Sequence, residues 1–285
     1  MIIDCHTHLN RYEDGQWATL QDRYAELKRE MRGNGVDHAL VLSSYAITES
    51  RPSTREILEV VGDDPQISVI AGVSYYNYRA ADLADLRSLL TEGRIKGLKL
   101  YPGYEAFYVH DARMRVVYEL AGEFGVPVMI HTGDTYDPKG KLKYAHPLEV
   151  DEVAVDFREV TFVICHLGNP WVTDAMEVIY KNDNVVGDIS GFTLGHFDER
   201  FEQYMLQAVK QVLIYAGNPS SLLFGTDWPI SQMASYLRFA RNLGLSAEET
   251  DLVLWKNTAR IFKLDPATFG DQGRGRDEID VDSSQ

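Results

Sequence analysis

The sequence predicts an α/β protein made of a single closed (β/α)8 TIM barrel. Eight short runs rich in Val, Ile and Leu have the length of strands, and amphipathic stretches separate them without a long interruption. Continuous apolar runs are typical of parallel strands that are buried on both faces. The chain has 285 residues, 45% of them hydrophobic, which suits one barrel of this kind. An open doubly wound sheet is less consistent, because it predicts a glycine-rich loop where this sequence has histidines.

The predicted elements alternate in order along the chain. Helices are predicted where apolar residues recur at helical spacing, as in Leu83, Leu86 and Leu90. Ser246 and Glu249 form a predicted capping box at the start of the last helix. The eight predicted strands cover residues 2–8, 36–44, 67–75, 95–101, 126–131, 160–166, 185–190 and 222–227.

One domain and a tail are predicted. The barrel is expected to span residues 1–265. Residues 266–285 are polar and charged and show no periodicity, so we expect a disordered C-terminal tail.

Charge and composition limit the class of partner. The formal net charge is −15 and Lys and Arg do not cluster, so nucleic acid is not predicted as a partner. No run approaches the roughly 20 apolar residues of a membrane span, and the N-terminus does not resemble a secretory signal. Cys5 and Cys165 lie far apart in apolar runs, so a disulfide is not expected. We therefore expect a cytoplasmic protein that binds a small molecule; its oligomeric state stays open, a homodimer included.

Chemically active side chains gather at the ends of four predicted strands. His6 and His8 end the first strand, His131 the fifth, His166 the sixth and Asp227 the eighth. In a barrel the C-terminal ends of the strands meet at one mouth, where active sites lie. A single histidine in an apolar strand is more often a hydrogen-bonded core residue. Agreement among four strand ends makes a shared site the better explanation.

Strand alternation predicts which side chains point into the barrel. It places Asp4 on the same face as His6 and His8, and Cys5 on the opposite face. It also places Cys165 opposite the histidine that follows it, so we interpret this thiol as part of the outer packing.

Three imidazoles and one carboxylate form a ligand set for a divalent cation. His6 and His8 can bind one ion from the same side, and a third histidine from another strand and the terminal Asp227 would add two further ligands. Such ligands suit zinc, with manganese and iron as alternatives. An open coordination position would hold a water whose pKa the ion lowers to about 7. The predicted cofactor is therefore one divalent metal ion, with zinc preferred.

The sequence resembles the amidohydrolase superfamily, and in particular the amidohydrolase-related branch that contains aminocarboxymuconate-semialdehyde decarboxylase. The segments that carry the resemblance span nearly the whole chain in the family's order: IDCHTH, KGLKLYP, VMIHTGD, VTFVICHLG, DISG, LLFGTDWP and NTARIFKL. The resemblance implies that His6, His8, His131 and Asp227 bind the metal. It also implies that Asp227 takes a proton from the nucleophilic water and that His166, beside the metal, is catalytic.

Lys99 departs from part of this superfamily. Some branches place a carboxylated lysine or a glutamate at the end of strand four, where it bridges two metals. Alternation turns Lys99 inward, and three interpretations are open: binding of a substrate carboxylate, a carboxylated bridge, or a side chain that extends to the barrel rim. We expect the first, and hence one metal ion.

Other residues near the mouth are weaker candidates. Tyr101 begins an aromatic segment that lines the pocket or packs within its loop, and Trp228 is expected to wall the same pocket. Asp134 is expected to face substrate or to cap a helix. Asp4 and Asp188 are expected to support ligand histidines, although Asp188 can equally bond to neighbouring backbone.

The sequence predicts an enzyme. The leading hypothesis is a metal-dependent hydrolase that acts on a small amide, lactone or other cyclic ester through a metal-activated water. The alternative uses the same residues for non-oxidative decarboxylation or hydration of an unsaturated or aromatic carboxylic acid. A non-catalytic metal-binding barrel is least consistent, because a decayed site should have lost at least one ligand. The fold by itself identifies no substrate.

Overall fold

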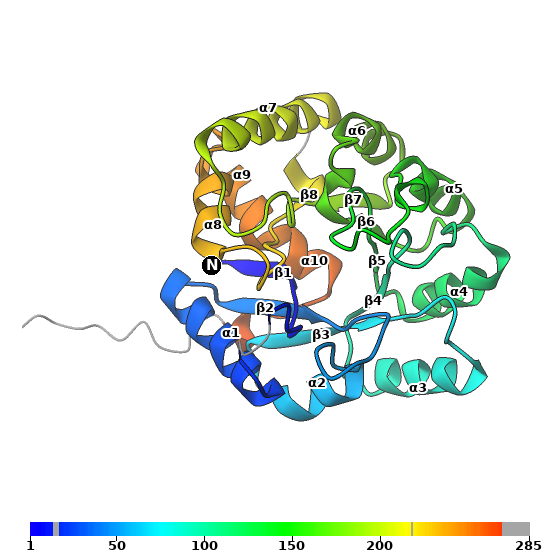
Figure 1. Ribbon diagram of the computed structural model, residues 1–285. Coiled ribbons are helices and arrows are strands. Elements are labelled where there is room, and N and C mark those ends of the chain that lie inside the picture. The colour runs from blue at the N-terminus through cyan, green and yellow to red at the C-terminus, as the bar shows by residue number, and fades with distance from the viewer. Residues whose placement is uncertain (14–16, 218, 270–285) are drawn as a thin grey trace, which may run out of the picture.

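The computed structural model describes residues 1–13, 17–217 and 219–269. In this part of the chain eight parallel strands follow one another in sequence order around a barrel (Figure 1). Each strand lies within its predicted range, so the predicted fold class is confirmed. The strands are β1 (Ile3–Thr7), β2 (His38–Leu42), β3 (Ile67–Gly72), β4 (Gly97–Leu100), β5 (Val128–Ile130), β6 (Phe162–Ile164), β7 (Val185–Asp188) and β8 (Leu222–Leu223).

Hydrogen bonds between the first strand and the segment after the last strand close the barrel. The Cys5 N–H donates to the Phe224 carbonyl at 2.9 Å, and the Asp227 N–H donates to the His6 carbonyl at 2.8 Å. Closure satisfies backbone groups that an open sheet would leave unpaired at its edge. It also brings the segment that carries Asp227 beside the strand that carries the first two histidines.

Helices surround the strands as an outer ring (Figure 1). In the chain that the structure describes, none of them is both long and apolar enough to cross a membrane. The Ser246 N–H donates to the Glu249 side chain at 2.8 Å, and Ser246 Oγ accepts from the Glu249 N–H at 3.3 Å, which confirms the predicted capping box. The helices are α1 (Leu20–Asn34), α2 (Thr54–Val61), α3 (Ala80–Thr91), α4 (Arg115–Phe124), α5 (Leu148–Asp156), α6 (Val172–Lys181), α7 (Glu199–Ala216), α8 (Met233–Arg241), α9 (Ala247–Asp251) and α10 (Asn257–Ile261).

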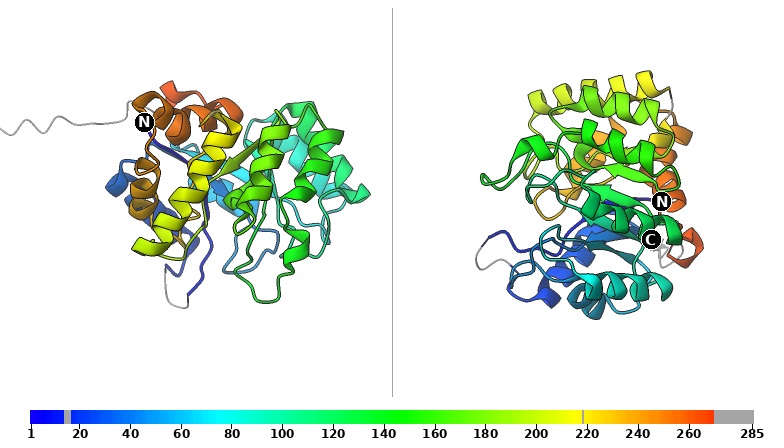
Figure 2. Two further views of the ribbon diagram at one scale, coloured as in Figure 1. Left: turned by 90° about the horizontal axis from the view of Figure 1, so that it is seen from above. Right: turned by 90° about the vertical axis from the view of Figure 1, so that its right-hand side faces the viewer.

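Two hydrophobic layers result from the alternation of side chains along the strands. The outward layer packs against the helices and includes Leu98 and Leu100. The inward layer fills the barrel and includes Leu42 and Met129. Figure 2 shows the last helices, in orange, at the end of the barrel opposite the longer loops. The longer loops are therefore free to build the site at the other end.

The segment after α10 closes the N-terminal end of the barrel. Phe269 is 3% exposed and its ring lies 4.3 Å from that of His38. Pro266–Thr268 form a single 3-10 turn. The first residues of the predicted tail are thus ordered. Residues 270–285 lie outside the described residues, so their disorder stays a prediction.

Candidate active site

Strand β1 directs two histidines into the barrel because its pairing with β2 shifts between residues 4 and 7. Such a shift is typical of a β-bulge, which re-aims side chains. Ile3 and Cys5 lie in the interior layer before the shift, and His6 and His8 line the central cavity after it. The prediction that Cys5 faces outward is therefore wrong, since simple alternation does not continue through the bulge.

His166 reaches the same cavity through a left-handed turn. Strand β6 ends at Ile164, and Cys165 continues the alternation into the interior layer. His166 and Leu167 then have φ angles of 59° and 44°, a region that side chains other than glycine rarely adopt. The turn swings the imidazole back over the barrel mouth. The prediction that Cys165 faces outward is wrong for this reason.

Asp227 has a similarly unusual backbone, with a φ angle of 66°. Its approach to β1 depends on Gly225, where an added Cβ would lie 2.9 Å from the His6 Cβ. His131 follows β5, and its N–H donates to the Leu100 carbonyl at 2.9 Å. Both residues line the cavity as predicted.

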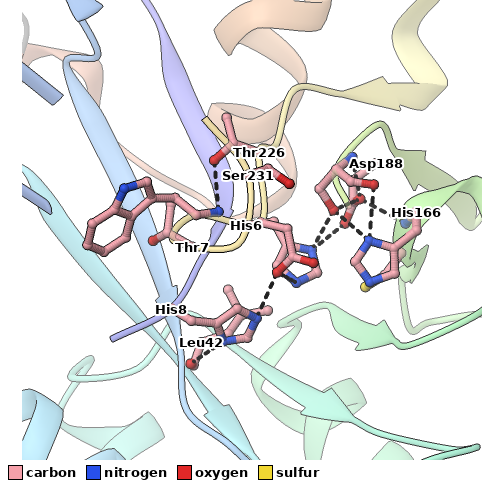
Figure 3. Close-up of polar contacts among 12 residues, drawn as sticks. His6, Thr7, His8, Leu42, His166, Asp188, Thr226 and Ser231 are labelled. Carbon is pink, nitrogen blue, oxygen red and sulfur yellow. Dashed lines mark hydrogen bonds and ion pairs between the residues drawn. The ribbon is translucent and has the colours of Figure 1, made fainter. Parts of the chain in front are cut away.

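Three of the four predicted ligands, His6, His8 and Asp227, lie close together, and Figure 3 shows the two histidines at this site. The His8 Nε2 lies 3.2 Å from Asp227 Oδ1, and the His6 Nε2 lies 3.8 Å from the same oxygen. Ligand atoms of these three residues all lie within 4.8 Å of one another. A single cation could therefore contact all three.

His131 lies at the edge of this group. Its ring centre is 5.1 Å from that of His166. Its Nε2 atom is buried and has no hydrogen-bond partner among the described residues. Leaving a buried polar atom unpaired costs free energy, so this nitrogen is suited to bind an ion. The donor set of three imidazoles and one carboxylate suits zinc, manganese or iron.

Hydrogen bonds orient the first two histidines. His6 Nδ1 lies 2.9 Å from Asp188 Oδ2, and His8 Nδ1 lies 2.9 Å from the Leu42 carbonyl oxygen. Both partners accept hydrogen bonds only, so each Nδ1 carries the hydrogen. The Nε2 atoms that face Asp227 therefore keep free lone pairs, as metal ligands require.

Burial favours neutral imidazoles in this cavity. It lowers the pKa of His6 to about 4, holds the pKa of His131 well below its usual value and lowers that of His166. Burial acts to raise the pKa of Asp227, but the polar groups around its carboxylate outweigh burial and hold this pKa below its ordinary value. Around pH 7 His6 and His131 thus offer neutral nitrogen donors beside an ionised Asp227 carboxylate.

Asp188 supports two histidines at once. Besides accepting from His6, its carboxylate accepts from the His166 N–H at 2.9 Å, the Ser190 N–H at 3.1 Å and the Ser190 hydroxyl at 2.5 Å. Both alternatives considered for Asp188, a ring partner and a backbone partner, are therefore present. Ser190 Oγ also lies 2.9 Å from His166 Nδ1, a contact that the sequence did not reveal.

Asp4 supports the backbone instead of an imidazole. Its carboxylate accepts from the His6 N–H at 3.1 Å, the Thr226 N–H at 3.0 Å and the Thr226 hydroxyl at 2.6 Å. Asp4 therefore holds the backbone of His6 and ties β1 to the segment after β8. Burial raises the pKa of Asp4 to about 7.

Lys99 stays inside the barrel and is 1% exposed, so it does not extend to the rim. Its Nζ contacts Cys165 Sγ at 2.7 Å. Lys99 also lines the central cavity with the histidines, which leaves a role in substrate binding open.

Aromatic side chains form much of the cavity wall. Tyr101 is buried, and its hydroxyl donates to the Ser43 carbonyl at 2.5 Å. Sequence reasoning missed Arg51, which donates to the Tyr45 hydroxyl at 3.2 Å. The loop after β2 carries Arg51, and the rule that sites use the C-terminal ends of strands would have pointed to it. The tyrosines that line the cavity are Tyr12, Tyr45, Tyr101, Tyr104 and Tyr136.

Two predicted substrate residues lie away from the central cavity. Trp228 is buried and stacks on Trp17 with 5.5 Å between ring centres, and it lines a neighbouring cavity. The prediction that it walls the metal pocket is wrong, because it lines this neighbouring cavity and does not line the central one. Asp134 is exposed and accepts a hydrogen bond from the Thr135 N–H at 2.9 Å. It begins no helix. It lines a cavity of about 310 Å³ that continues from the mouth.

Comparison with known proteins identifies the family. The model of a family described as amidohydrolase matches residues 3–264. The chain therefore belongs to the amidohydrolase family, as its sequence motifs indicated. No curated protein matches the sequence.

Solved structures of the same fold are distant in sequence. An uncharacterised TIM-barrel protein from Bordetella bronchiseptica has 21% identity and a TM-score of 0.73, over 94% of this chain and 99% of the other. A probable 2-pyrone-4,6-dicarboxylic acid hydrolase from Acinetobacter baumannii, with citric acid bound, has 17% identity and a TM-score of 0.64, over 92% and 99%. A dihydroxybenzoic acid decarboxylase from Polaromonas sp. JS666, with bound manganese and 2-nitroresorcinol, has 15% identity and a TM-score of 0.66, over 92% and 97%. At these identities the likeness establishes the fold alone.

Proposed function

We propose that the protein is a metal-dependent hydrolase that acts on a small amide, lactone or other cyclic ester. One observation carries the proposal. His6, His8 and Asp227 place ligand atoms within 4.8 Å of one another, and the unpaired Nε2 of buried His131 lies in the same cavity. These four residues would hold one divalent ion, with zinc preferred and manganese or iron as alternatives.

A bound divalent ion would supply Lewis-acid polarisation and would lower the pKa of a coordinated water. The protein supplies the other components. Asp227 is held ionised, so besides holding the ion its carboxylate would be able to accept a proton from the attacking water. His166 Nδ1 lies 3.1 Å from the Ser190 carbonyl oxygen, which leaves Nε2 to hydrogen-bond the reacting group of the substrate and to stabilise its developing charge.

The charges in the cavity favour a substrate with a carboxylate. Lys99 and Arg51 both line it, and a desolvated site strengthens the attraction between a cation and an anion. The continuing cavity of about 310 Å³ has room for a small organic molecule. We propose that this small molecule, and neither nucleic acid nor a membrane, is the partner. The cytoplasmic location and a homodimer stay predictions.

A second candidate is non-oxidative decarboxylation or hydration of an unsaturated or aromatic acid. The observation that favours it is the set of tyrosine rings around the cavity, since Tyr45 lies 5.1 Å from Tyr101 and 5.8 Å from Tyr104 between ring centres. Flat aromatic walls suit a planar acid. Solved structures of this fold include both a probable pyrone dicarboxylic acid hydrolase and a decarboxylase.

Metal analysis tests the site. We expect one equivalent of divalent metal per chain, and a loss of metal and activity in His131→Ala. His110→Ala is the matched control, because His110 is exposed and pairs with Glu149 at 3.1 Å. Two metal equivalents, or full activity without the His131 imidazole, would contradict the proposal.

Product analysis separates the two candidate reactions. The metal-loaded enzyme is offered lactones and amides that carry a carboxylate, and then aromatic and enol acids. Ring opening or amide cleavage supports the hydrolase, whereas release of carbon dioxide or addition of water supports the second candidate.

A further inference from the structure

Lys99 and Cys165 form an unusual pair inside the barrel. Both side chains are buried, and Nζ lies 2.7 Å from Sγ and 5.3 Å from the centre of the Tyr101 ring. Among the described residues, no carboxylate lies within ion-pair distance of Nζ. A buried ammonium is costly unless it is paired with an acid, so a thiol is a poor partner for it.

The separation between the two atoms is too short for an ordinary hydrogen bond. A nitrogen donor usually lies about 2.9 Å from an oxygen acceptor, and sulfur is a larger atom than oxygen. A hydrogen bond to sulfur would therefore hold Nζ farther away than the observed 2.7 Å. One oxygen atom with single bonds to both nitrogen and sulfur would hold them at about this separation.

A small oxidant can reach this pair. Lys99 lines the central cavity, and the adjoining cavity shares His131 and His166 with it and continues to the mouth. Burial raises the pKa of the Cys165 thiol, although the nearby Lys99 lowers it in part. Little thiolate is therefore present, and oxidation starts slowly. Because the amine is held beside the sulfur, formation of the crosslink is favoured over oxidation of the thiol alone.

We propose that Lys99 and Cys165 are a modification site at which dioxygen forms a covalent Nζ–O–Sγ crosslink. The neutral amine loses one hydrogen and the thiol loses one hydrogen, while an N–O bond and an O–S bond form. One oxygen atom of dioxygen becomes the bridge, and the other leaves as water with the two hydrogens. Nitrogen and sulfur each give up two electrons, and dioxygen accepts all four. The additional proton of the ammonium passes to solvent.

The crosslink would regulate the site, a consequence that rests on the proposed function. The bridged nitrogen is no longer an ammonium, so it loses the charge that attracts a substrate carboxylate. Reduction by two molecules of dithiothreitol returns four electrons, restores the amine and the thiol, and releases the bridging oxygen as water. Activity should fall as the crosslink forms and recover on reduction.

Mass spectrometry of the full-length, metal-loaded protein tests the crosslink directly. After long exposure to air-saturated buffer we expect an intact mass higher by one oxygen and lower by two hydrogens. Digestion should yield one peptide pair that joins residues 99 and 165, and dithiothreitol should separate it. Cys165→Ser should abolish the change. Cys5→Ser is the matched control, because Cys5 is a buried thiol of the same interior layer and should leave the crosslink intact.

Other results would overturn the proposal. These are an unchanged mass, oxygen atoms added to Cys165 without linkage, or a link that lacks oxygen and so joins sulfur directly to nitrogen. Because the mass needs no substrate, its outcome is separate from that of the proposed function. A crosslinked protein that turns over no candidate substrate would refute the function and leave the modification site standing.

Discussion

At the scale of single residues, the site depends on groups that fix imidazoles more than on the imidazoles alone. Asp188 accepts hydrogen bonds from the His6 ring, the His166 backbone and Ser190. One carboxylate thereby sets the orientation of a proposed metal ligand and the left-handed turn that carries His166. A change of one atom at Asp188 should disturb both.

Replacing Asp188 with Asn tests this coupling. The amide offers one acceptor oxygen in place of two, so His6 or Ser190 must lose its partner. Loss of such support typically costs 10–100-fold in metal affinity, and we expect a decrease of about that size in a competition titration with a chelator. Asp134→Asn is the control, since Asp134 is exposed at the mouth. Equal affinities of the two variants would refute the role of Asp188.

At the scale of elements, the ends of the strands explain which features the sequence could predict. The strands and the barrel follow from apolar runs, and the approach of the histidines to Asp227 follows from their places at strand ends. The inward direction of Cys5 and Cys165 did not follow, because a bulge in β1 and the left-handed turn after β6 interrupt the alternation. No regular pattern in the sequence marks such interruptions. Arg51 escaped notice because its loop returns to the cavity through tertiary packing.

The loop after β7 offers a test at this scale. Gly191 has a φ angle of 63°, and an added Cβ would lie 2.4 Å from His166 Nδ1 and 2.8 Å from Asp227 Oδ2. Gly191→Ala should therefore displace two residues of the site and decrease activity roughly 100-fold, the cost of a small misplacement of reacting groups. The measurement is steady-state activity together with metal content.

Gly195 in the same loop is the matched control for backbone strain. Its φ angle is 68°, and an added Cβ would meet nothing within 4 Å. Gly195→Ala should lose about 1 kcal/mol of stability because alanine disfavours this backbone region, and Gly191→Ala should lose at least as much. Only Gly191→Ala should lose activity. Similar activity losses in both variants would show that strain, and not contact with His166, is responsible.

At the scale of the whole molecule, the two ends of the barrel have separate tasks. The C-terminal mouth carries the site, while the other end is closed by α10 and Phe269, as is expected when that end serves stability. His38 belongs to the closed end. Its Nδ1 lies 3.1 Å from the Pro65 carbonyl oxygen and its Nε2 lies 3.0 Å from Ser68 Oγ. Burial lowers the pKa of His38 to about 4, so the folded protein keeps this ring neutral.

Acid should therefore destabilise the protein through His38. The unfolded chain binds a proton at a pKa of about 6.5, whereas the folded protein binds it only near pH 4. The contribution of His38 to the free energy of unfolding is fully present above pH 6.5, falls as the pH decreases toward about 4, and then levels off. The total loss is roughly 3 kcal/mol. Urea unfolding between pH 7 and pH 4 measures it, with His38→Gln as the comparison and metal removed from both proteins. The site histidines titrate equally in the two proteins, so the stability gap between them should shrink on acidification; a gap that stays constant would exclude His38 as the cause.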